Sequence, residues 1–115
     1  MDHVIHVDNS GFFRKIMRTF LLELGLESES FQQGWDALIA VKAGRASCVI
    51  TALELPDMKG EEFIRQLAKM EQPVSVIVFS ANLDEKRIKF LEAQGVLGII
   101  EKTSNWKEDL RKFFL

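Results

Sequence analysis

The sequence has little of several features that define other protein classes. Its 115 residues include one cysteine, two prolines and no apolar run approaching the roughly 18 residues that a membrane-spanning helix needs. The single Cys48 cannot form an internal disulfide, which suits a reducing compartment. No cationic segment followed by a long apolar stretch opens the chain. We therefore expect a cytoplasmic protein without a membrane segment, with Cys48 as a small buried hydrophobe.

Extended positive charge is missing as well. The net charge is −2 and no Lys/Arg-rich run occurs, whereas proteins that hold nucleic-acid backbones present a basic field. Direct binding to nucleic acid is not expected. What the chain does have is 47% hydrophobic residues without a repeat or a Pro/Ser-rich linker. This composition predicts one domain over residues 1–115 with a single buried core.

Strand-like and helix-like patterns alternate from end to end. Strands are predicted at Val4–Asp8, Leu26–Phe31, Ser47–Ala52, Val74–Phe79 and Val96–Glu101. Helices are predicted at Gly11–Leu24, Trp35–Ala43, Gly60–Met70, Asp84–Gln94 and from Asn105 onward, with Gly25, Gly44 and Gly95 placed to end three of them. This alternation with short loops predicts an α/β fold, a parallel sheet covered by helices on both faces.

Side-chain spacing within the helices gives further expectations. Glu61 and Arg65 are at i,i+4, as are Glu85 and Lys89, and this spacing predicts an ion pair in each case. Asn105 with Glu108 three residues later forms a capping-box pattern.

Aromatic residues near the carboxyl end divide into core and surface candidates. Trp106, Leu110 and one of Phe113 and Phe114 fit the apolar stripe of the last helix, and we expect them in the core. Exposure of Phe90 and of the other terminal phenylalanine would mark a partner-binding surface.

Two histidines lie close together near the start of the chain. His3 and His6 are three positions apart in a strand, so their side chains point to opposite faces and do not share a metal ion. His6 is expected to be hydrogen-bonded in or near the sheet.

In a parallel α/β sheet, ligands bind beyond the carboxyl ends of the strands. That rule selects Asp8 and Asn9 after the first strand, Ala52 after the third, Ser80 after the fourth and Lys102 after the fifth. An acid, an amide, a hydroxyl and a lysine in one crevice suit phosphoryl chemistry with a hard cation such as Mg²⁺. The nucleophile is missing, because the methyl group of Ala52 cannot accept a phosphoryl group.

The whole chain resembles the receiver domains of two-component response regulators. The resemblance is carried by four segments: Val7-Asp8-Asn9-Ser10, Leu55-Pro56-Asp57-Met58-Lys59-Gly60, Ser80-Ala81, and Gly95-Val96-Leu97-Gly98 leading to Lys102. It implies a flavodoxin-like (βα)5 fold with strand order 2-1-3-4-5. It also implies that the chain is a signalling module of a phosphorelay and not an enzyme.

The resemblance assigns a role to each strand-end residue. The phosphorylated aspartate of the family lies four residues before the loop proline, which here is Ala52. Asp8 and Asn9 match the acidic pair of the Mg²⁺ site, to which Glu54 would add its backbone carbonyl. Ser80 matches the switch hydroxyl and Lys102 the active-site lysine.

Four positions depart from the family pattern. Ala52 removes the acceptor and one metal ligand, and Asn9 replaces a carboxylate, so Mg²⁺ binding should be weak or absent. Ile99 stands where a switch aromatic is frequent, which puts the coupled motion of hydroxyl and ring in doubt. Thr103 replaces the proline that commonly follows the lysine, so a cis peptide bond is not expected there.

Structural alternatives exist for individual residues. Asp8 with Ser10 could cap a helix, Ser80 could cap a turn, and Lys102 could be a solvated surface lysine. Glu54 could place a charge near the empty acceptor position. A small flavodoxin-like cofactor binder is the alternative for the whole chain, but it would need a phosphate-cradling loop after the first strand, and Asn9-Ser10-Gly11-Phe12-Phe13 is too short and bulky for one.

Ala52 has two possible origins. We favour an engineered replacement of the aspartate in a working receiver, because Asp8, Ser80 and Lys102 persist. The alternative is a natural pseudo-receiver that binds proteins independently of phosphorylation. Expected partners are a histidine kinase or phosphotransfer protein, an effector or output domain on the surface of the last two helices and the strand between them, and a second copy of the chain.

Overall fold

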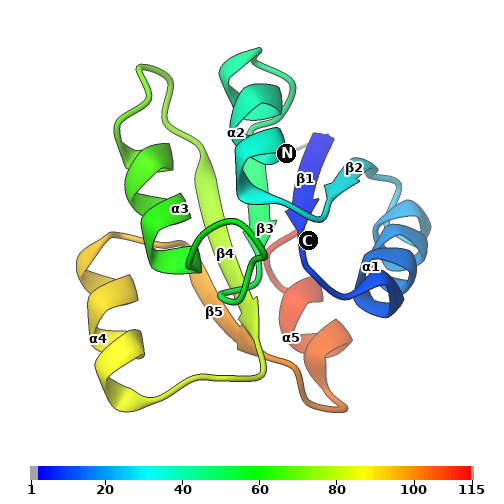
Figure 1. Ribbon diagram of the computed structural model, residues 1–115. Coiled ribbons are helices and arrows are strands. Elements are labelled where there is room, and N and C mark those ends of the chain that lie inside the picture. Colours follow the sequence, from blue (N-terminus) through cyan, green and yellow to red (C-terminus); the bar gives the residue numbers. More distant parts are fainter. Residues whose placement is uncertain (1–2, 115) are drawn as a thin grey trace.

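The structure, a computed structural model, describes residues 3–114 and contains a five-stranded parallel sheet in the order β2-β1-β3-β4-β5 (Figure 1). The strands are β1 (His3–Val7), β2 (Glu27–Phe31), β3 (Cys48–Thr51), β4 (Ser75–Ser80) and β5 (Gly98–Glu101). The helices are α1 (Gly11–Glu23), α2 (Gly34–Lys42), α3 (Gly60–Ala68), α4 (Glu85–Ala93) and α5 (Trp106–Arg111). The predicted fold and strand order are confirmed. The predicted domain of 1–115 also includes Met1, Asp2 and Leu115, which lie outside the described residues.

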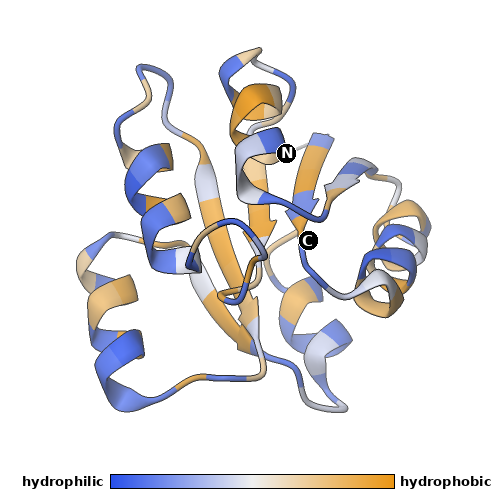
Figure 2. Ribbon diagram, viewed as in Figure 1, coloured by the Kyte–Doolittle hydropathy of each residue, from blue (hydrophilic) through white to orange (hydrophobic). Residues whose placement is uncertain are grey.

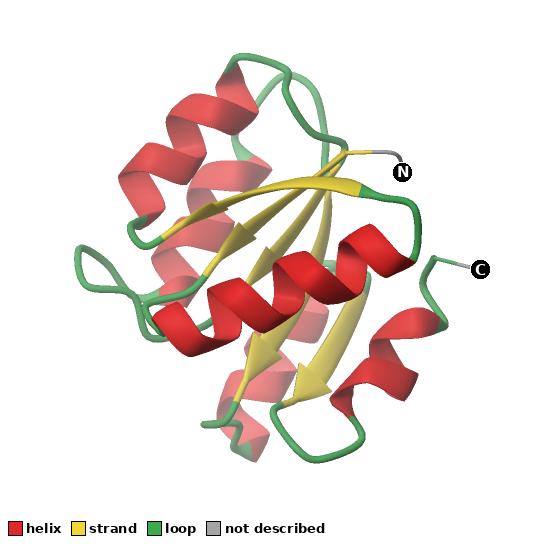
Figure 3. Ribbon diagram, turned by 90° about the vertical axis from the view of Figure 1, so that its right-hand side faces the viewer, coloured by secondary structure: helices red, strands yellow, loops and turns green. Residues whose placement is uncertain are grey.

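Helices cover both faces of the sheet, with α1 and α5 on one side and α2, α3 and α4 on the other (Figures 1 and 3). The apolar central strands lie between these two layers (Figure 2). One core cluster joins β1, β3 and β4 to α2, α3 and α4, and a second joins the opposite sides of the same strands to α1 and α5. The central strands β3 and β4 are nearly continuous apolar runs because both of their faces are buried.

The sequence placed the boundaries of these elements to within two residues of those in the structure. Three helices end where predicted because Gly25, Gly44 and Gly95 adopt a positive φ of 79°, 76° and 75°. Residues that carry a Cβ rarely adopt a positive φ, so a glycine ends the helix at each of these positions. β2 is an edge strand, since it pairs with β1 alone.

Two helix-level predictions are wrong and one is confirmed. Arg65 lies 3.4 Å from Glu62, at i,i+3, and Glu61 instead pairs with a residue of α4. The capping box of α5 does not form, because the Asn105 side chain makes no capping hydrogen bond. The Glu85–Lys89 pair is present at 3.3 Å.

No helix within residues 3–114 has the length and hydropathy that crossing a bilayer requires.

Candidate functional site

The predicted site residues meet at the carboxyl edge of the sheet. Asp8, Ala52 and Lys102 each follow the last residue of a strand, and Ser80 ends β4. Backbone hydrogen bonds extend the sheet to these positions: Ala52 N–H donates to the Val7 carbonyl at 2.9 Å, and Lys102 N–H to the Ser80 carbonyl at 3.1 Å. The sheet therefore fixes the backbone of all four residues side by side.

A buried ion pair occupies one half of this site. Lys102 Nζ lies 2.9 Å from Asp8 Oδ2, and the two side chains are 11% and 2% exposed. The ammonium also lies 4.3 Å from the centre of the Phe13 ring and 5.2 Å from that of Phe79, within the range of cation–π attraction. Lys102 is therefore neither a solvated surface lysine nor free to point away from the site.

Asp8 is held by three neighbours. Its Oδ1 accepts a hydrogen bond from Ser10 N–H at 2.9 Å, and Ser10 in turn caps α1 by accepting from Phe13 N–H at 3.2 Å. Burial opposes the charged carboxylate, but the His6 ring, the Ser10 N–H and the Lys102 ammonium outweigh it and lower the pKa of Asp8 below its usual value. Asp8 thus supports the Ser10 cap of α1, as the structural alternative predicted, and it also forms an ion pair with Lys102 that the sequence did not predict.

His6 lies under this pair, inside the sheet. It is 1% exposed, and its Nε2 is 3.5 Å from Asp8 Oδ2, at the outer limit of hydrogen bonding. His6 lies in the sheet, as predicted. Neither of its ring nitrogens has an aligned hydrogen bond among the described residues, so the predicted hydrogen bond is wrong. Burial lowers the pKa of His6 despite the nearby carboxylate, and the ring is neutral at pH 7. His3, on the opposite face, contacts Glu27 and Glu29, so the histidines do not share a site.

Ala52 sits in a tight backbone environment. Its side chain is buried, with 4% exposure, and its carbonyl accepts a hydrogen bond from the Thr51 hydroxyl at 2.8 Å. The first residue of α3, Gly60, approaches so closely that a Cβ on it would lie 2.8 Å from the Ala52 carbonyl oxygen and 2.5 Å from Leu53 Cα. Only glycine fits there, so the loop that follows Ala52 is held against the strand end.

Two other predicted residues, Asn9 and Ser80, have local partners. Asn9 is exposed, and its Oδ1 accepts from Gln32 Nε2 at 3.1 Å, towards the β2 side of the site. Ser80 is 3% exposed, and its hydroxyl accepts from Asn82 N–H at 3.1 Å, which is the turn-capping alternative. Within residues 3–114 there is no cis peptide bond, as expected for Thr103 after Lys102.

A second charged centre, which sequence reasoning missed, surrounds Arg87 of α4. Its guanidinium contacts Glu54 at 2.7 Å and Glu61 of α3 at 2.7 Å, and it donates to the Asn82 carbonyl at 2.9 Å. Both carboxylates raise the pKa of Arg87, and the Arg87 hydrogen bond lowers that of Glu61. Glu54 is directed to Arg87, which removes the reason to treat it as a stand-in charge at position 52. No short-range pattern announces this cluster, since its members come from three parts of the chain.

The residues present do not fit a Mg²⁺ site. Of the four residues that meet at the strand ends, Asp8, Ala52, Ser80 and Lys102, Asp8 alone carries a carboxylate, and its two oxygens already face Ser10 N–H and the Lys102 ammonium. The described residues contain no group of three His, Cys, Asp or Glu side chains placed to hold a metal ion. A hard divalent cation prefers several oxygen ligands, whereas here an ammonium group lies against the available one.

Exposed apolar residues do not gather on the predicted partner surface. Phe90, Phe113 and Phe114 are all partly buried against the two cores, and Arg65 stacks 4.8 Å from the Phe90 ring centre. Trp106 and Leu110 are buried as predicted. The most exposed large apolar side chains are instead Phe12 and Leu22 of α1 and Trp35 and Ile39 of α2, with Leu97 before β5.

Comparisons with known proteins agree with this architecture. The family model described as response regulator receiver domain matches residues 4–113. Chemotaxis protein CheY-3 of Vibrio cholerae serotype O1 is 28% identical over 117 residues, covering 96% of this chain and 90% of that protein.

Two solved structures have the same fold. The chemotaxis response regulator CheY4 of Vibrio cholerae superposes with a TM-score of 0.88 at 22% identity, covering 100% of this chain and 99% of that one. The receiver domain of sensor histidine kinase PA1611 from Pseudomonas aeruginosa PAO1 superposes with a TM-score of 0.86 at 20% identity, covering 98% and 93%. That structure has a magnesium ion coordinated in its active-site cleft. Together with the family match over almost the whole chain, the fold and its strand-end site place this chain in the receiver-domain family of response regulators.

Proposed function

We propose that this chain is a receiver domain that does not accept a phosphoryl group and acts through protein contacts in a single charge state. The observation that carries the proposal is Ala52 at the end of β3, beside an Asp8–Lys102 pair that is complete without it. We assign Ala52 to the acceptor position, Ser80 to the switch hydroxyl and Lys102 to the active-site lysine of the family.

The electrostatics of the site support this assignment. In a working receiver a lysine would neutralise charge on the acceptor, but here Lys102 neutralises Asp8. Phosphorylation would signal by adding negative charge at position 52, which would draw Lys102 away from Asp8. Ala52 supplies no such charge. Mg²⁺, which the family binds, would supply charge neutralisation for phosphoryl transfer; the donors of this chain do not favour it.

Partners follow from the family. Receiver domains are signalling modules that contact histidine kinases or phosphotransfer proteins and effectors. A kinase or phosphotransfer protein could still dock on this chain without transferring a phosphoryl group. Contact with an effector or output domain, on α4-β5-α5 or elsewhere, would then be independent of the phosphorylation state.

Restoring the acid tests the proposal. The variant Ala52→Asp is incubated with Mg²⁺ and acetyl phosphate or beryllium fluoride, and intact mass and amide shifts are recorded beside the unchanged chain. We expect phosphorylation, and shifts at Ser80 and Lys102, in the variant alone. Incorporation of phosphate into the unchanged chain, on any residue, would contradict the proposal, and silence of Ala52→Asp both alone and combined with Asn9→Asp would remove Ala52 from the acceptor position.

The same variant separates the two origins of Ala52. An engineered replacement in a working receiver predicts that Ala52→Asp alone restores phosphorylation. A natural pseudo-receiver, in which Asn9 already replaces a carboxylate, predicts that Ala52→Asp needs Asn9→Asp as well before it responds to Mg²⁺. The Asn9→Asp variant with Ala52 unchanged is the matched control and is expected to stay inert.

A further inference from the structure

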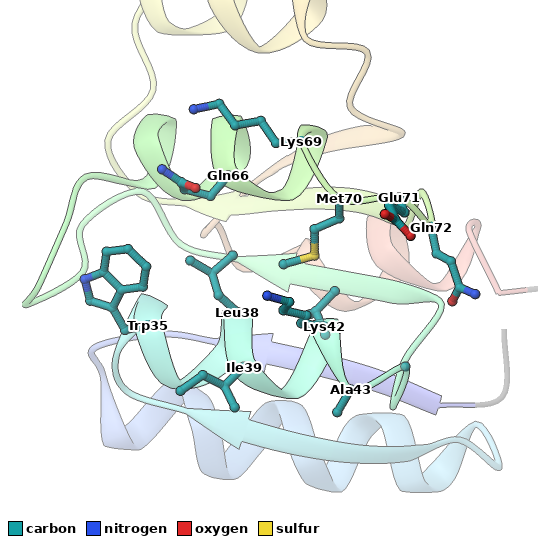
Figure 4. A pocket seen from close by; sticks show the side chains of 12 residues that line it. Trp35, Leu38, Ile39, Lys42, Ala43, Gln66, Lys69, Met70, Glu71 and Gln72 are labelled. Atoms are coloured by element: carbon teal, nitrogen blue, oxygen red, sulfur yellow. The ribbon is translucent and has the colours of Figure 1, made fainter.

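A groove runs between α2 and α3, away from the strand-end site (Figure 4). Its volume is 930 Å³. Leu38 forms part of its floor, Met70 projects into it from the end of α3, and Trp35 and Ile39 line its α2 side. Trp35 is 55% exposed and Ile39 67% exposed, although both are large and apolar. This is an apolar surface without a partner in residues 3–114.

The α2 side of the groove is held rigidly. Asp57, in the loop before α3, accepts hydrogen bonds from Gly34 N–H at 2.8 Å and Trp35 N–H at 2.9 Å. A Cβ on Gly34 would lie 2.9 Å from Met58 Sδ, so glycine allows this close approach. The backbone that presents Trp35 is therefore fixed before any partner arrives, and preorganised tryptophans are frequent hot spots of binding.

The charges around the groove select the occupant. Lys42 and Lys69 line it, and neither forms an ion pair within the described part of the chain. Glu71 is the one carboxylate of the lining, and it lies beside Gln72 at the end opposite Trp35 (Figure 4). The groove is thus basic although the chain carries a net charge of −2. Acidic side chains on a partner would be attracted to it.

A second copy of the chain does not meet this requirement. Two of the three exposed large apolar residues that its described part carries outside the groove, Phe12 and Leu22, belong to α1, where the exposed residues Lys15 and Arg18 are basic; the third, Leu97, lies before β5. Docking α1 into the groove would bring these cations towards Lys42 and Lys69.

We propose that the α2–α3 groove binds an acidic amphipathic helix of a partner protein. Trp35 and Ile39, at i,i+4 on α2, would contact the apolar side of that helix, and Lys42 and Lys69 its acidic flanks. α2 is nine residues long, so an occupant of about three turns would span the groove. This surface differs from the α4-β5-α5 surface, and it goes beyond the proposed function because its use does not depend on residue 52.

The test uses a synthetic peptide of roughly 12 residues, with leucines at helical spacing and glutamates on both flanks, and a twin in which lysines replace the glutamates. Amide shifts, and the tryptophan fluorescence to which Trp35 and Trp106 both contribute, are followed during titration into the whole chain. We expect saturable shifts on α2 and the end of α3 with the acidic peptide, affinity that falls with added salt, and much weaker binding of the basic twin.

Variants define the groove. Trp35→Ala is expected to weaken binding at least about tenfold, and Lys42→Glu with Lys69→Glu to reverse the preference between the two peptides. Leu22→Ala removes an apolar side chain on α1 that is 68% exposed, and should change nothing. All four positions are exposed, so folding, checked by circular dichroism, is expected to persist.

Three outcomes would overturn the proposal. They are the absence of saturable binding by the acidic peptide, equal affinity of the Trp35→Ala variant, and dimerisation of the free chain that Trp35→Ala abolishes, which would assign the groove to a second copy. The titration is repeated with Ala52→Asp, unphosphorylated, for which the same affinity is expected. Failure of the groove therefore leaves the phosphorylation result untouched, and the reverse also holds.

Discussion

Two charged centres lie at the same edge of the sheet, and they are built differently. In the first, Asp8 and Lys102 are almost completely removed from water, at 2% and 11% exposure. In the second, Arg87 is 16% exposed, but its partner Glu54 is 62% exposed, and the charge is shared with Glu61. Water can replace a lost partner in the second centre and cannot readily do so in the first.

The difference indicates what each centre does. Removing one member of a buried pair leaves an uncompensated charge, so Asp8 and Lys102 hold one another in place. Arg87 instead joins α4 to α3 and to the loop after β3 through several moderate contacts. The first centre fixes the state of the strand-end site, and the second fixes the position of α4 relative to it.

The largest expected effect comes from breaking the buried pair. Asp8→Ala leaves the Lys102 ammonium without its carboxylate and should lower the free energy of unfolding by about 3 kcal/mol. Urea denaturation measures this. Adding Lys102→Met to Asp8→Ala removes the stranded charge and is expected to recover most of the loss. Equal stability of the single and double variants would show that the pair is not coupled.

Acid should act on the buried centre earlier than on the exposed one. The folded pKa of His6 lies below its ordinary 6.5, so below pH 6.5 the unfolded chain binds a proton that the folded chain excludes. As the pH decreases below 6.5, the free energy of unfolding therefore decreases by up to about 1.4 kcal/mol per pH unit, until the folded pKa of His6 is reached. Asp8, with its pKa lowered from 3.8, adds a further loss as the pH falls below that value.

Urea midpoints between pH 8 and pH 3 check this order. His6→Leu is expected to remove the part of the loss that begins near pH 6.5 and to keep the later part. His3→Gln, on the other face of β1, is the matched control and should keep both parts. A His6→Leu profile identical to that of the unchanged chain would be inconsistent with a neutral buried His6.

A smaller loss is expected at the second centre. Arg87→Ala removes two carboxylate contacts and one bond to the Asn82 carbonyl, and it should cost about 1–2 kcal/mol, reduced by salt because Glu54 is exposed. Arg87→Lys keeps the charge but not the forked geometry, so its free energy of unfolding should lie between those of the unchanged chain and of Arg87→Ala. If Arg87→Ala destabilised as much as Asp8→Ala, the contrast between the centres would disappear.

The smallest effect is expected from a fully surface pair. Lys89 and Glu85 are 72% and 85% exposed at 3.3 Å, and Lys89→Ala should change stability by less than about 0.5 kcal/mol. Thermal denaturation of Lys89→Ala sets the baseline against which the other charge variants are judged. A loss comparable to that of Arg87→Ala would mean that exposure does not rank these pairs.

The fold could be predicted well from the sequence because its strands and helix ends are signalled by residues close together in the chain. Apolar runs fully buried on both faces defined β1, β3 and β4, and glycines with positive φ defined three helix ends. The ion pairs were less predictable, since Glu61 has a candidate partner at i,i+4 but bonds to Arg87, 26 residues away. Spacing along a helix cannot weigh a partner that packing brings from another element.

The site was predictable as a set of positions but not as a set of contacts. Topology placed Asp8, Ala52, Ser80 and Lys102 together, yet nothing in the sequence paired Lys102 with Asp8. The groove gave one overlooked signal: in α2, Trp35 and Ile39 lie off the inward stripe of Leu38 and Val41, so the helix is apolar on more than one side. A surface helix with that pattern predicts a partner.

Cys48 lies in the middle of the sheet, on the same strand that leads to Ala52. It is fully buried, and burial raises its pKa to about 12, so the thiol does not react in the folded chain. Reagents such as dithionitrobenzoate can reach it only when β3 opens. The rate at which this one native thiol is modified therefore reports how often the centre of the sheet is exposed. Because Cys48 is unreactive in the folded chain, the thiol introduced by Ile39→Cys could be labelled selectively with a fluorophore at the groove.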